Sequence, residues 1–233
     1  MEAWLINLPT FTTLATAKDS TFKVADIIPI CNHLTETGVV VVKADSKWKT
    51  LKELVDECKA NPGKLRASTN GVQASNHTAA QLLAQSADFT YKAIPYGGTA
   101  DQLLALRQGE VQFSCAKVAD VAKLVKGDKA ELRVLGVFAK ERVADLPNVP
   151  TLGELGYYKE WYGSARALVA PAGTPKEAID FYVAAFKKTM EDPAVVEQHK
   201  KGGLAMDFMD NAKLGELIKA QEVFCRDVVS KLY

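Results

Sequence analysis

The sequence predicts an α/β fold in which mainly parallel sheets carry helices on both faces. Strand-like and helical patterns alternate through most of the 233 residues, and this order is typical of parallel sheets. The segments Ala44–Ser46 and Gly163–Pro171 indicate two crossings of the chain between lobes. Two crossings would create two lobes around a cleft, and ligands bind preferentially in such clefts.

The first clear strand and helix follow each other before residue 64. Val39–Lys43 is a short β-branched run of the kind found in strands that are buried on both faces. Thr50 and Glu53 form a capping box that predicts the start of a helix. The following Asn61-Pro62-Gly63 predicts its end, because proline cannot continue a helix. Further strands are expected at Leu65–Thr69, Phe89–Ile94, Val111–Cys115 and Leu132–Phe138, and further helices at 75–85, 100–108 and 118–125.

Two polar residues beside prolines predict helix starts in the last third of the chain. Thr174 is expected to cap a helix that has Pro175 at its first position, and Asp192 with Pro193 repeats this arrangement. The other elements expected after Pro150 are a short helix at Thr151–Leu155, an extended segment at Ser164–Val169, a strand at Leu204–Met209 and a final helix capped by Asp210.

The composition excludes several classes of function. The chain is 48% hydrophobic and 24% charged, with a net charge of +1, so it has no electrostatic footprint for nucleic acid or an anionic membrane. No apolar run has the length of a membrane span, and no signal peptide is visible at the start. The cysteines match no zinc-binding or CxxC spacing, so we expect buried free thiols. We also expect no metal site and no cofactor.

Several segments in order resemble one known family. These are KTLKELVDECKANPGKL, STNGVQASNH, IPYGG, QGEV, LRVLGVFAKER, LPNVPTLGELG and APAGTP. From about Thr35 to the C-terminus the chain resembles the tripartite tricarboxylate transporter substrate-binding family, also called Bug-type receptors. The resemblance implies a type II periplasmic-binding-protein-like fold and a non-enzymatic periplasmic receptor. Such a receptor closes on a small carboxylate like a Venus flytrap and delivers it to a membrane permease.

The resemblance also implies how the lobes are divided. The second lobe would comprise residues 45–163, and the first would combine residues 1–44 with residues 164–233. Family members carry about 70 more residues before this point, so an incomplete first lobe would expose an edge strand and apolar surface that favour a homodimer. A different function therefore stays open, that of a non-transporting remnant acting as an interaction, assembly or sensor-contact module.

The loop after Leu65–Thr69 is the sharpest candidate site. Small hydroxyls and a glycine let backbone N–H groups approach a carboxylate, and the dipole of the following helix favours an anion. The alternative is an ordinary Asn70-Gly71 turn followed by an N-cap at Ser75 or Asn76. Local sequence alone favours the turn, whereas the resemblance favours ligand binding by Ser68, Thr69, Asn70, Gly71 and Ser75.

Two further candidates carry titratable side chains. His77 is in the first turn of the predicted helix and is included as a ligand-binding candidate, although packing or support of the helix cap is the stronger interpretation. No nucleophile or orienting acid accompanies it in a known motif, so we expect no catalytic residue. Lys117, with Asp120 close behind, either pairs with an anionic ligand or lies on a solvated face.

The last candidates follow another predicted parallel strand. Tyr96, Gly97 and Gly98 lie in the loop after Phe89–Ile94, and loops at the carboxyl ends of parallel strands line ligand crevices. The aromatic ring would flank a ligand while the glycines let the backbone come near. The alternative is a structural Pro-Tyr-Gly-Gly turn.

Overall fold

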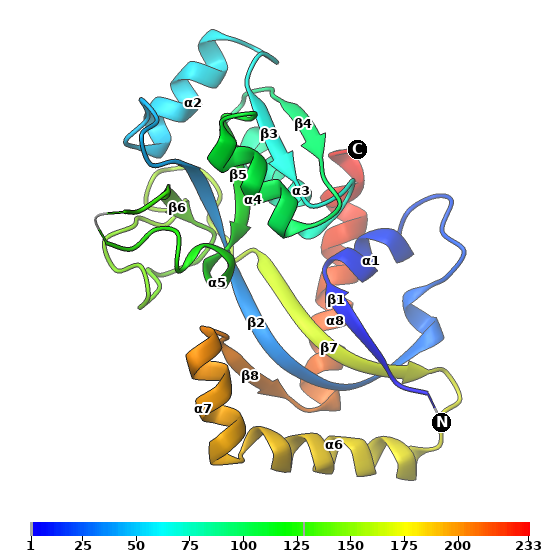
Figure 1. Ribbon diagram of the computed structural model, residues 1–233. Coiled ribbons are helices and arrows are strands. Elements are labelled where there is room, and N and C mark those ends of the chain that lie inside the picture. The colour runs from blue at the N-terminus through cyan, green and yellow to red at the C-terminus, as the bar shows by residue number, and fades with distance from the viewer. Residues whose placement is uncertain (1, 128) are drawn as a thin grey trace. The chain divides into compact units, whose positions relative to one another are not determined.

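The computed structural model describes residues 2–127 and 129–233 and divides into two compact units (Figure 1). Unit 1 combines the residues up to Glu36 with Ser164–Lys231 and Tyr233. Unit 2 comprises Thr37–Gly163 and Leu232. The first boundary falls inside one long strand, β2 (Ile27–Lys43), whose two halves therefore belong to different units.

Unit 1 is built on an antiparallel sheet with the strand order β1–β7–β2–β8. β1 pairs with β7, and β8 pairs with the first half of β2. The strands that accompany β2 are β1 (Trp4–Leu8), β7 (Gly163–Pro171) and β8 (Met206–Met209). The helices of unit 1 are α1 (Thr10–Ala15), η1 (Val24–Asp26), α6 (Lys176–Met190), α7 (Pro193–Gly202), α8 (Asn211–Asp227) and η2 (Val229–Lys231).

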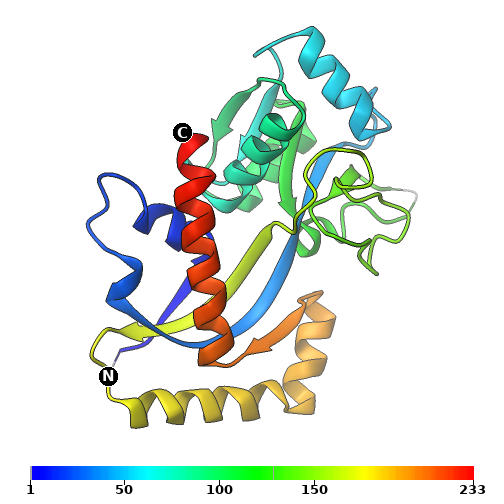
Figure 2. The same cartoon turned by 180° about the vertical axis from the view of Figure 1, so that it is seen from behind.

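Successive residues of β7 pack against helices on opposite faces of this sheet. Ala165 and Ala167 belong to an apolar cluster with Leu214 of α8, whereas Ala170 packs with Ile179 of α6. The alternation follows from the two-residue period of a strand. Figure 2 shows α8 lying along the sheet face that is hidden in Figure 1.

The helix starts of unit 1 follow the predicted chemistry with one exception. Asp192 accepts a hydrogen bond from the amide of Ala194, and Asp210 accepts one from the amide of Lys213, so both predicted caps are confirmed. The cap predicted at Thr174 is wrong. Its hydroxyl donates to the carbonyl of Pro171, and Pro175 occupies the N-cap position instead.

Unit 2 has the strand order β6–β2–β5–β3–β4. Its strands, besides the second half of β2, are β3 (Arg66–Thr69), β4 (Lys92–Pro95), β5 (Phe113–Lys117) and β6 (Leu132–Val137). Its helices are α2 (Leu51–Ala60), α3 (Ser75–Ser86), α4 (Thr99–Gln108) and α5 (Val118–Val121). The capping box at the start of α2 is confirmed, because the Thr50 hydroxyl accepts from the Glu53 amide while the Glu53 carboxylate accepts from the Thr50 amide.

The prediction of mainly parallel sheets is wrong in detail. β3 pairs in parallel with β4 and β5, but β2 pairs antiparallel with both β5 and β6. The reason is topological, since β2 enters unit 2 from unit 1 and runs against the direction of the β–α–β strands. The predicted alternation of strands and helices identified β3, β4 and β5 correctly. It did not predict that β2, beside β5, runs in the opposite direction.

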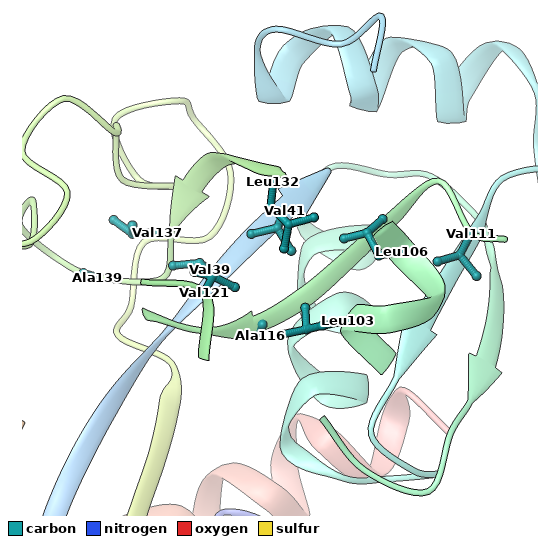
Figure 3. Packing of buried hydrophobic residues seen from close by; sticks show 10 residues of the cluster. All are labelled: Val39, Val41, Leu103, Leu106, Val111, Ala116, Val121, Leu132, Val137 and Ala139. Atoms are coloured by element: carbon teal, nitrogen blue, oxygen red, sulfur yellow. The ribbon is translucent and has the colours of Figure 1, made fainter. Parts of the chain in front are cut away.

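The parallel part of unit 2 places two helices on opposite faces. The chain moves outward from β3 to β4 through α3, and then returns past β3 to β5 through α4. Because such crossovers are right-handed, opposite directions of travel put α3 and α4 on opposite faces. Figure 3 shows one of these faces, where Leu103 and Leu106 of α4 pack with Val39 and Val41 of β2.

Two predicted helices differ from the structure. The segment Thr151–Leu155 forms turns, because Thr151 bridges to Val137 and Gly156 already adopts a left-handed φ of 81°. The helix expected at 118–125 is only α5, four residues long. Among the described residues, no helix combines the length and apolar character that crossing a bilayer requires.

Candidate functional site

Residues 70–74 form a short loop between β3 and α3 with an unusual backbone. Gly71 has a φ of 124° and Gln73 a φ of 59°, both in the left-handed region. Val72 is 68% exposed, which places the outer side of the loop in solvent. In the described part of the chain, no hydrogen bond uses the amides of Gly71, Val72 or Ala74 as donor. Successive backbone amides that donate to no protein acceptor, in a loop with positive φ angles, are suited to hold an anion.

The start of α3 adds a second favourable feature. Its N-cap is Ala74, which offers no side-chain acceptor, so neither Ser75 nor Asn76 serves as the cap that the alternative interpretation expected. One first-turn amide, that of Asn76, donates to the side-chain oxygen of Asn70 at 3.3 Å. The amides of the first turn and the helix dipole favour negative charge at this point.

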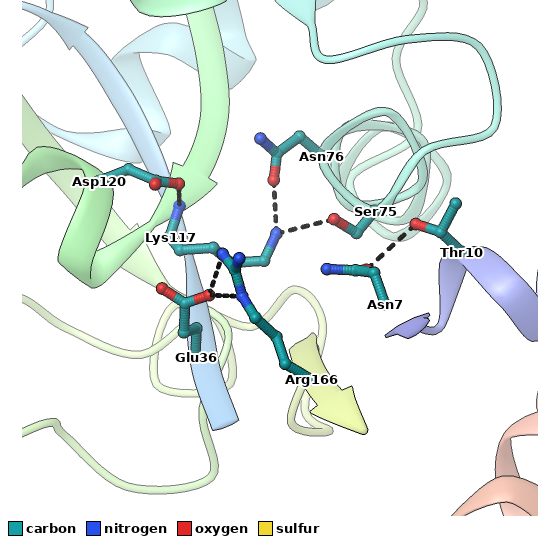
Figure 4. Close-up of polar contacts among 8 residues, drawn as sticks. All are labelled: Asn7, Thr10, Glu36, Ser75, Asn76, Lys117, Asp120 and Arg166. Atoms are coloured by element: carbon teal, nitrogen blue, oxygen red, sulfur yellow. Dashed lines mark hydrogen bonds and ion pairs between the residues drawn. The ribbon is translucent and has the colours of Figure 1, made fainter. Parts of the chain in front are cut away.

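Lys117 brings a cation to the same helix turn. It is the last residue of β5 and is only 4% exposed. Its ammonium donates to the hydroxyl of Ser75 at 3.1 Å and to the side-chain oxygen of Asn76 (Figure 4). The carboxylate of Asp120 accepts from the backbone amide of Lys117 at 3.0 Å. Of the sequence-predicted residues, Lys117 and Ser75 are therefore brought together from positions far apart in the chain.

A buried polar network holds this arrangement in place. The Asn76 amide nitrogen donates to Oε1 of Gln102 at 3.0 Å, and Nε2 of Gln102 donates to the carbonyl of Cys115 at 2.6 Å. The Ser114 hydroxyl donates to the carbonyl of Ser68 at 3.0 Å. These bonds link α3, α4, β5 and β3, and satisfied buried networks of this kind make side-chain positions well defined.

The predicted residues Ser68 and Thr69 lie below the loop. Both are fully buried at the end of β3. The Ser68 hydroxyl donates to the carbonyl of Gln102 at 2.9 Å, while the carbonyl of Thr69 accepts from the amide of Tyr96 at 2.9 Å. Their contacts thus connect the loop to α4 and to the end of β4.

His77 contacts the loop through its ring. Its Nδ1 atom accepts a hydrogen bond from the backbone amide of Gln73 at 3.0 Å. Burial lowers the pKa of His77 below its usual value, which favours the neutral ring that this bond requires. The cap-supporting interpretation is consistent with this contact.

In the described contacts, the Tyr96–Gly98 loop is connected to the site through one backbone hydrogen bond, from the amide of Tyr96 to the carbonyl of Thr69. The Tyr96 hydroxyl donates to the Glu110 carboxylate at 3.1 Å. Burial and this carboxylate raise the pKa of Tyr96. Gly98 is extended, with a φ of 173°, and a Cβ there would meet no atom within 4 Å. No described geometry therefore requires glycine at this position.

The sequence matches one family profile over nearly all of this architecture. Residues 6–232 match the family described as "Tripartite tricarboxylate transporter family receptor". The chain belongs to this receptor family. The resemblance inferred from the ordered segments is thus confirmed.

Curated relatives of this receptor-family chain are longer than the chain itself. It is 32% identical over 211 residues to the UPF0065 protein in the gbd 5' region of Cupriavidus necator, covering 91% of this chain and 63% of that protein. It is 26% identical over 172 residues to BugT of Bordetella pertussis, covering 74% of this chain and 52% of that protein. The chain thus spans about three fifths of the length of the first of these relatives, 63%.

Solved structures of low sequence identity share the fold of this chain. MatC from Rhodopseudomonas palustris with bound malate has a TM-score of 0.87 at 19% identity, covering 97% of this chain and 78% of that chain. The periplasmic binding protein BugD has a TM-score of 0.84 at 23% identity, covering 99% and 77%. An R. palustris protein with adipate has a TM-score of 0.83 at 19% identity, covering 98% and 76%. These likenesses confirm the predicted α/β, type II periplasmic-binding-protein-like fold.

Some polar residues of the receptor were not predicted from sequence. Asn76, Gln102 and Ser114 belong to no recognisable motif, and their side chains meet only after folding. In unit 1, described by itself, the Arg166 guanidinium pairs with the buried Glu36 carboxylate at 3.0 Å, as Figure 4 shows. Glu36 stands between Thr35 and Thr37, so no local sequence signal marked this acid as buried.

The cysteines of the receptor behave as the sequence predicted. All four are free and buried. Burial raises the pKa of Cys31, Cys58 and Cys115 to about 12, which keeps these thiols protonated. In the described ranges 2–127 and 129–233, no three His, Cys, Asp or Glu side chains gather as metal ligands would.

Proposed function

We propose that the protein is an extracytoplasmic solute receptor that captures a small carboxylate-bearing metabolite for a tripartite tricarboxylate-type transporter. Family membership supports this assignment. The observation that carries it at the level of residues is the buried Lys117, whose ammonium contacts Ser75 and Asn76 in the first turn of α3, the helix that follows the loop of residues 70–74. The neighbours with bound malate and adipate indicate the chemical class of the ligand.

In the proposed site, both backbone amides and side chains bind the ligand. The amides of Gly71, Val72 and Ala74 would hold one carboxylate, and the ammonium of Lys117 would supply the compensating charge. Charge-assisted hydrogen bonds of this kind are roughly twice as strong as neutral ones. Ser75 would contribute its hydroxyl, whereas the buried Ser68 and Thr69 would support the loop from below.

The Tyr96–Gly98 loop stays a proposed ligand contact. The bond from the Tyr96 amide to the Thr69 carbonyl ties this loop to the end of β3, next to residue 70. A ligand held on the 70–74 loop would meet the Tyr96 backbone if it extended along the carboxyl ends of β3 and β4.

The cellular role is also part of the proposal. We place the receptor in the periplasm, where it would deliver its ligand to the membrane permease of the transporter. It would bind the carboxylate without transforming it. The homodimer expected from the sequence gains no support from the comparisons.

A ligand screen tests the proposal directly. Thermal shift and calorimetry with malate, adipate, citrate, acetate and amino acids should show a saturable response to at least one carboxylate. A folded sample without any response would contradict the receptor assignment. If light scattering then showed a stable dimer, the result would favour the interaction or assembly module instead.

A further inference from the structure

The loop that carries the proposed site is attached to α3 by one specific bond. The amide of Gln73 donates to Nδ1 of His77 at 3.0 Å, across a separation of four residues. Gln73 is one of two residues other than glycine, in the described ranges, that adopt a positive φ. A left-handed backbone at such a residue costs free energy and persists only where other contacts stabilise it.

The contact defines the chemical state of the His77 ring. A backbone amide can only donate, so Nδ1 must carry a lone pair, and the neutral ring then carries its proton on Nε2. His77 is 7% exposed, and this burial opposes a charged ring. The histidine therefore acts as a fixed acceptor that faces the loop.

The same turn of α3 bears the other polar contacts of the site. Ser75 and Asn76 bind the Lys117 ammonium, and Asn76 also donates its amide to Asn70 at the start of the loop. The loop is thus held at two points. At its start the Asn70 side chain accepts from the Asn76 amide, and near its end the Gln73 amide donates to His77. Between these two points lie Gly71 and Val72, whose amides donate to no described acceptor.

We propose that His77 is a positioning residue which, through its Nδ1 acceptor, holds Gln73 in the left-handed conformation and so preorganises the amides of Gly71, Val72 and Ala74 for an anion. This inference rests on the proposed function for its consequence in affinity. It assigns His77 no contact with the ligand. A preorganised loop binds more tightly because less ordering is required when the ligand arrives.

Two substitutions separate the acceptor from the bulk of the ring. In His77→Asn the side-chain Oδ1 occupies nearly the position of Nδ1, so the acceptor is retained. In His77→Leu a side chain of comparable size lacks any acceptor. A cooperative thermal transition in each variant would show that both are folded.

The first readout requires no ligand. Amide exchange measured by NMR should be slow at Gln73 in the wild type and in His77→Asn, and at least about fivefold faster in His77→Leu, the factor expected for one hydrogen bond of ordinary strength. The ring nitrogen spectrum of the wild type should show Nδ1 unprotonated and Nε2 protonated. Equal exchange at Gln73 in all three proteins would overturn the proposal.

The second readout is the affinity for malate and adipate by calorimetry. We expect His77→Leu to weaken binding about fivefold or more and His77→Asn to restore most of the loss. Equal weakening by both variants would overturn the positioning role. If the wild type bound no carboxylate, the proposed function would fail while the exchange experiment still decided the role of His77.

Discussion

The ammonium of Lys117 lies 3.1 Å from the hydroxyl oxygen of Ser75 and thereby ties the end of β5 to the first turn of α3. The two residues are 42 positions apart in the chain. A cation next to a helix N-terminus is unfavourable for the helix dipole, which prefers negative charge there. An anion bound at this turn would interact favourably with both the ammonium and the dipole.

Replacing Lys117 should therefore weaken ligand binding. Lys117→Met keeps the apolar stem and removes the charge, and we expect a loss of at least about tenfold in carboxylate affinity, the value of one charge-assisted hydrogen bond. Calorimetry with malate or adipate measures the change. The exposed Lys92 provides a matched control, because Lys92→Met removes the same charge on β4. Similar losses in both variants would indicate a general effect of net charge.

Gly71 should tolerate no side chain. Its φ of 124° is rarely adopted by other residues, so Gly71→Ala should destabilise the loop by about 1–3 kcal/mol and weaken carboxylate binding. Urea unfolding and calorimetry measure the two effects. An alanine variant with unchanged affinity and stability would argue against a fixed left-handed loop.

At Gly215 we expect the opposite effect, a gain of stability on substitution by alanine. It lies inside α8, and a Cβ would meet only Pro29 Cγ at an ordinary contact distance of 3.6 Å. Gly215→Ala should raise the free energy of unfolding by about 0.5–1 kcal/mol, because glycine is unfavourable in a helix interior. Urea unfolding checks the sign, and a destabilised variant would show that α8 lies closer to β2 than the structure places it.

The pair His33 and His199 should make unit 1 sensitive to acid. Their Nε2 atoms lie 2.7 Å apart, and the second ring also contacts the carbonyl of Val195 at 2.8 Å. Burial, then the charges of His199 and Arg166, lower the pKa of His33 below 6.5. The unfolded chain therefore binds a proton more readily, so stability is present above about pH 6.5 and falls as the pH drops through the lowered value.

Unfolding measured in urea between pH 7.5 and pH 5 tests this effect. The wild type should lose stability as the pH falls, and His33→Phe should have a shallower pH dependence. The buried His77 contributes in the same direction in both proteins and thus leaves a residual slope. Identical slopes would show that His33 does not titrate differently in the folded state.

The ion pair between Glu36 and Arg166 should matter for the stability of unit 1. The Glu36 side chain is 3% exposed, whereas that of Arg166 is 44% exposed, so solvent screening reduces the value of the pair. Arg166→Gln should cost about 1.5–3 kcal/mol because it leaves a buried carboxylate poorly paired. The double variant with Glu36→Gln should recover part of this loss, and strictly additive losses would refute the coupling.

Local signals predicted much of the fold. The caps at Thr50, Asp192 and Asp210 are encoded within a few residues, so the sequence pattern located those helices. The direction of β2 could not be predicted in this way, because strand direction depends on the path of the chain between units. The turn at Thr151 differs for a similar reason, since its bridge to Val137 is a tertiary contact.

The candidate site was predictable only in outline. The small polar loop after β3 and Lys117 after β5 could be recognised from residue types beside strands. The contacts of Asn76 and Gln102 could not, because they depend on how α3 and α4 pack against the sheet of unit 2. The acceptor role of His77 likewise needs the actual backbone of Gln73.

The central claim is that this chain binds a small metabolite through its negative charge. Calorimetry of the wild type with malate and with its uncharged diamide tests this claim most directly, since the two molecules have nearly the same shape. We expect saturable one-site binding of malate, or of adipate or citrate in parallel titrations, and no measurable binding of the matching amide. Equal binding of acid and amide, or a folded sample that binds no carboxylate, would contradict the account.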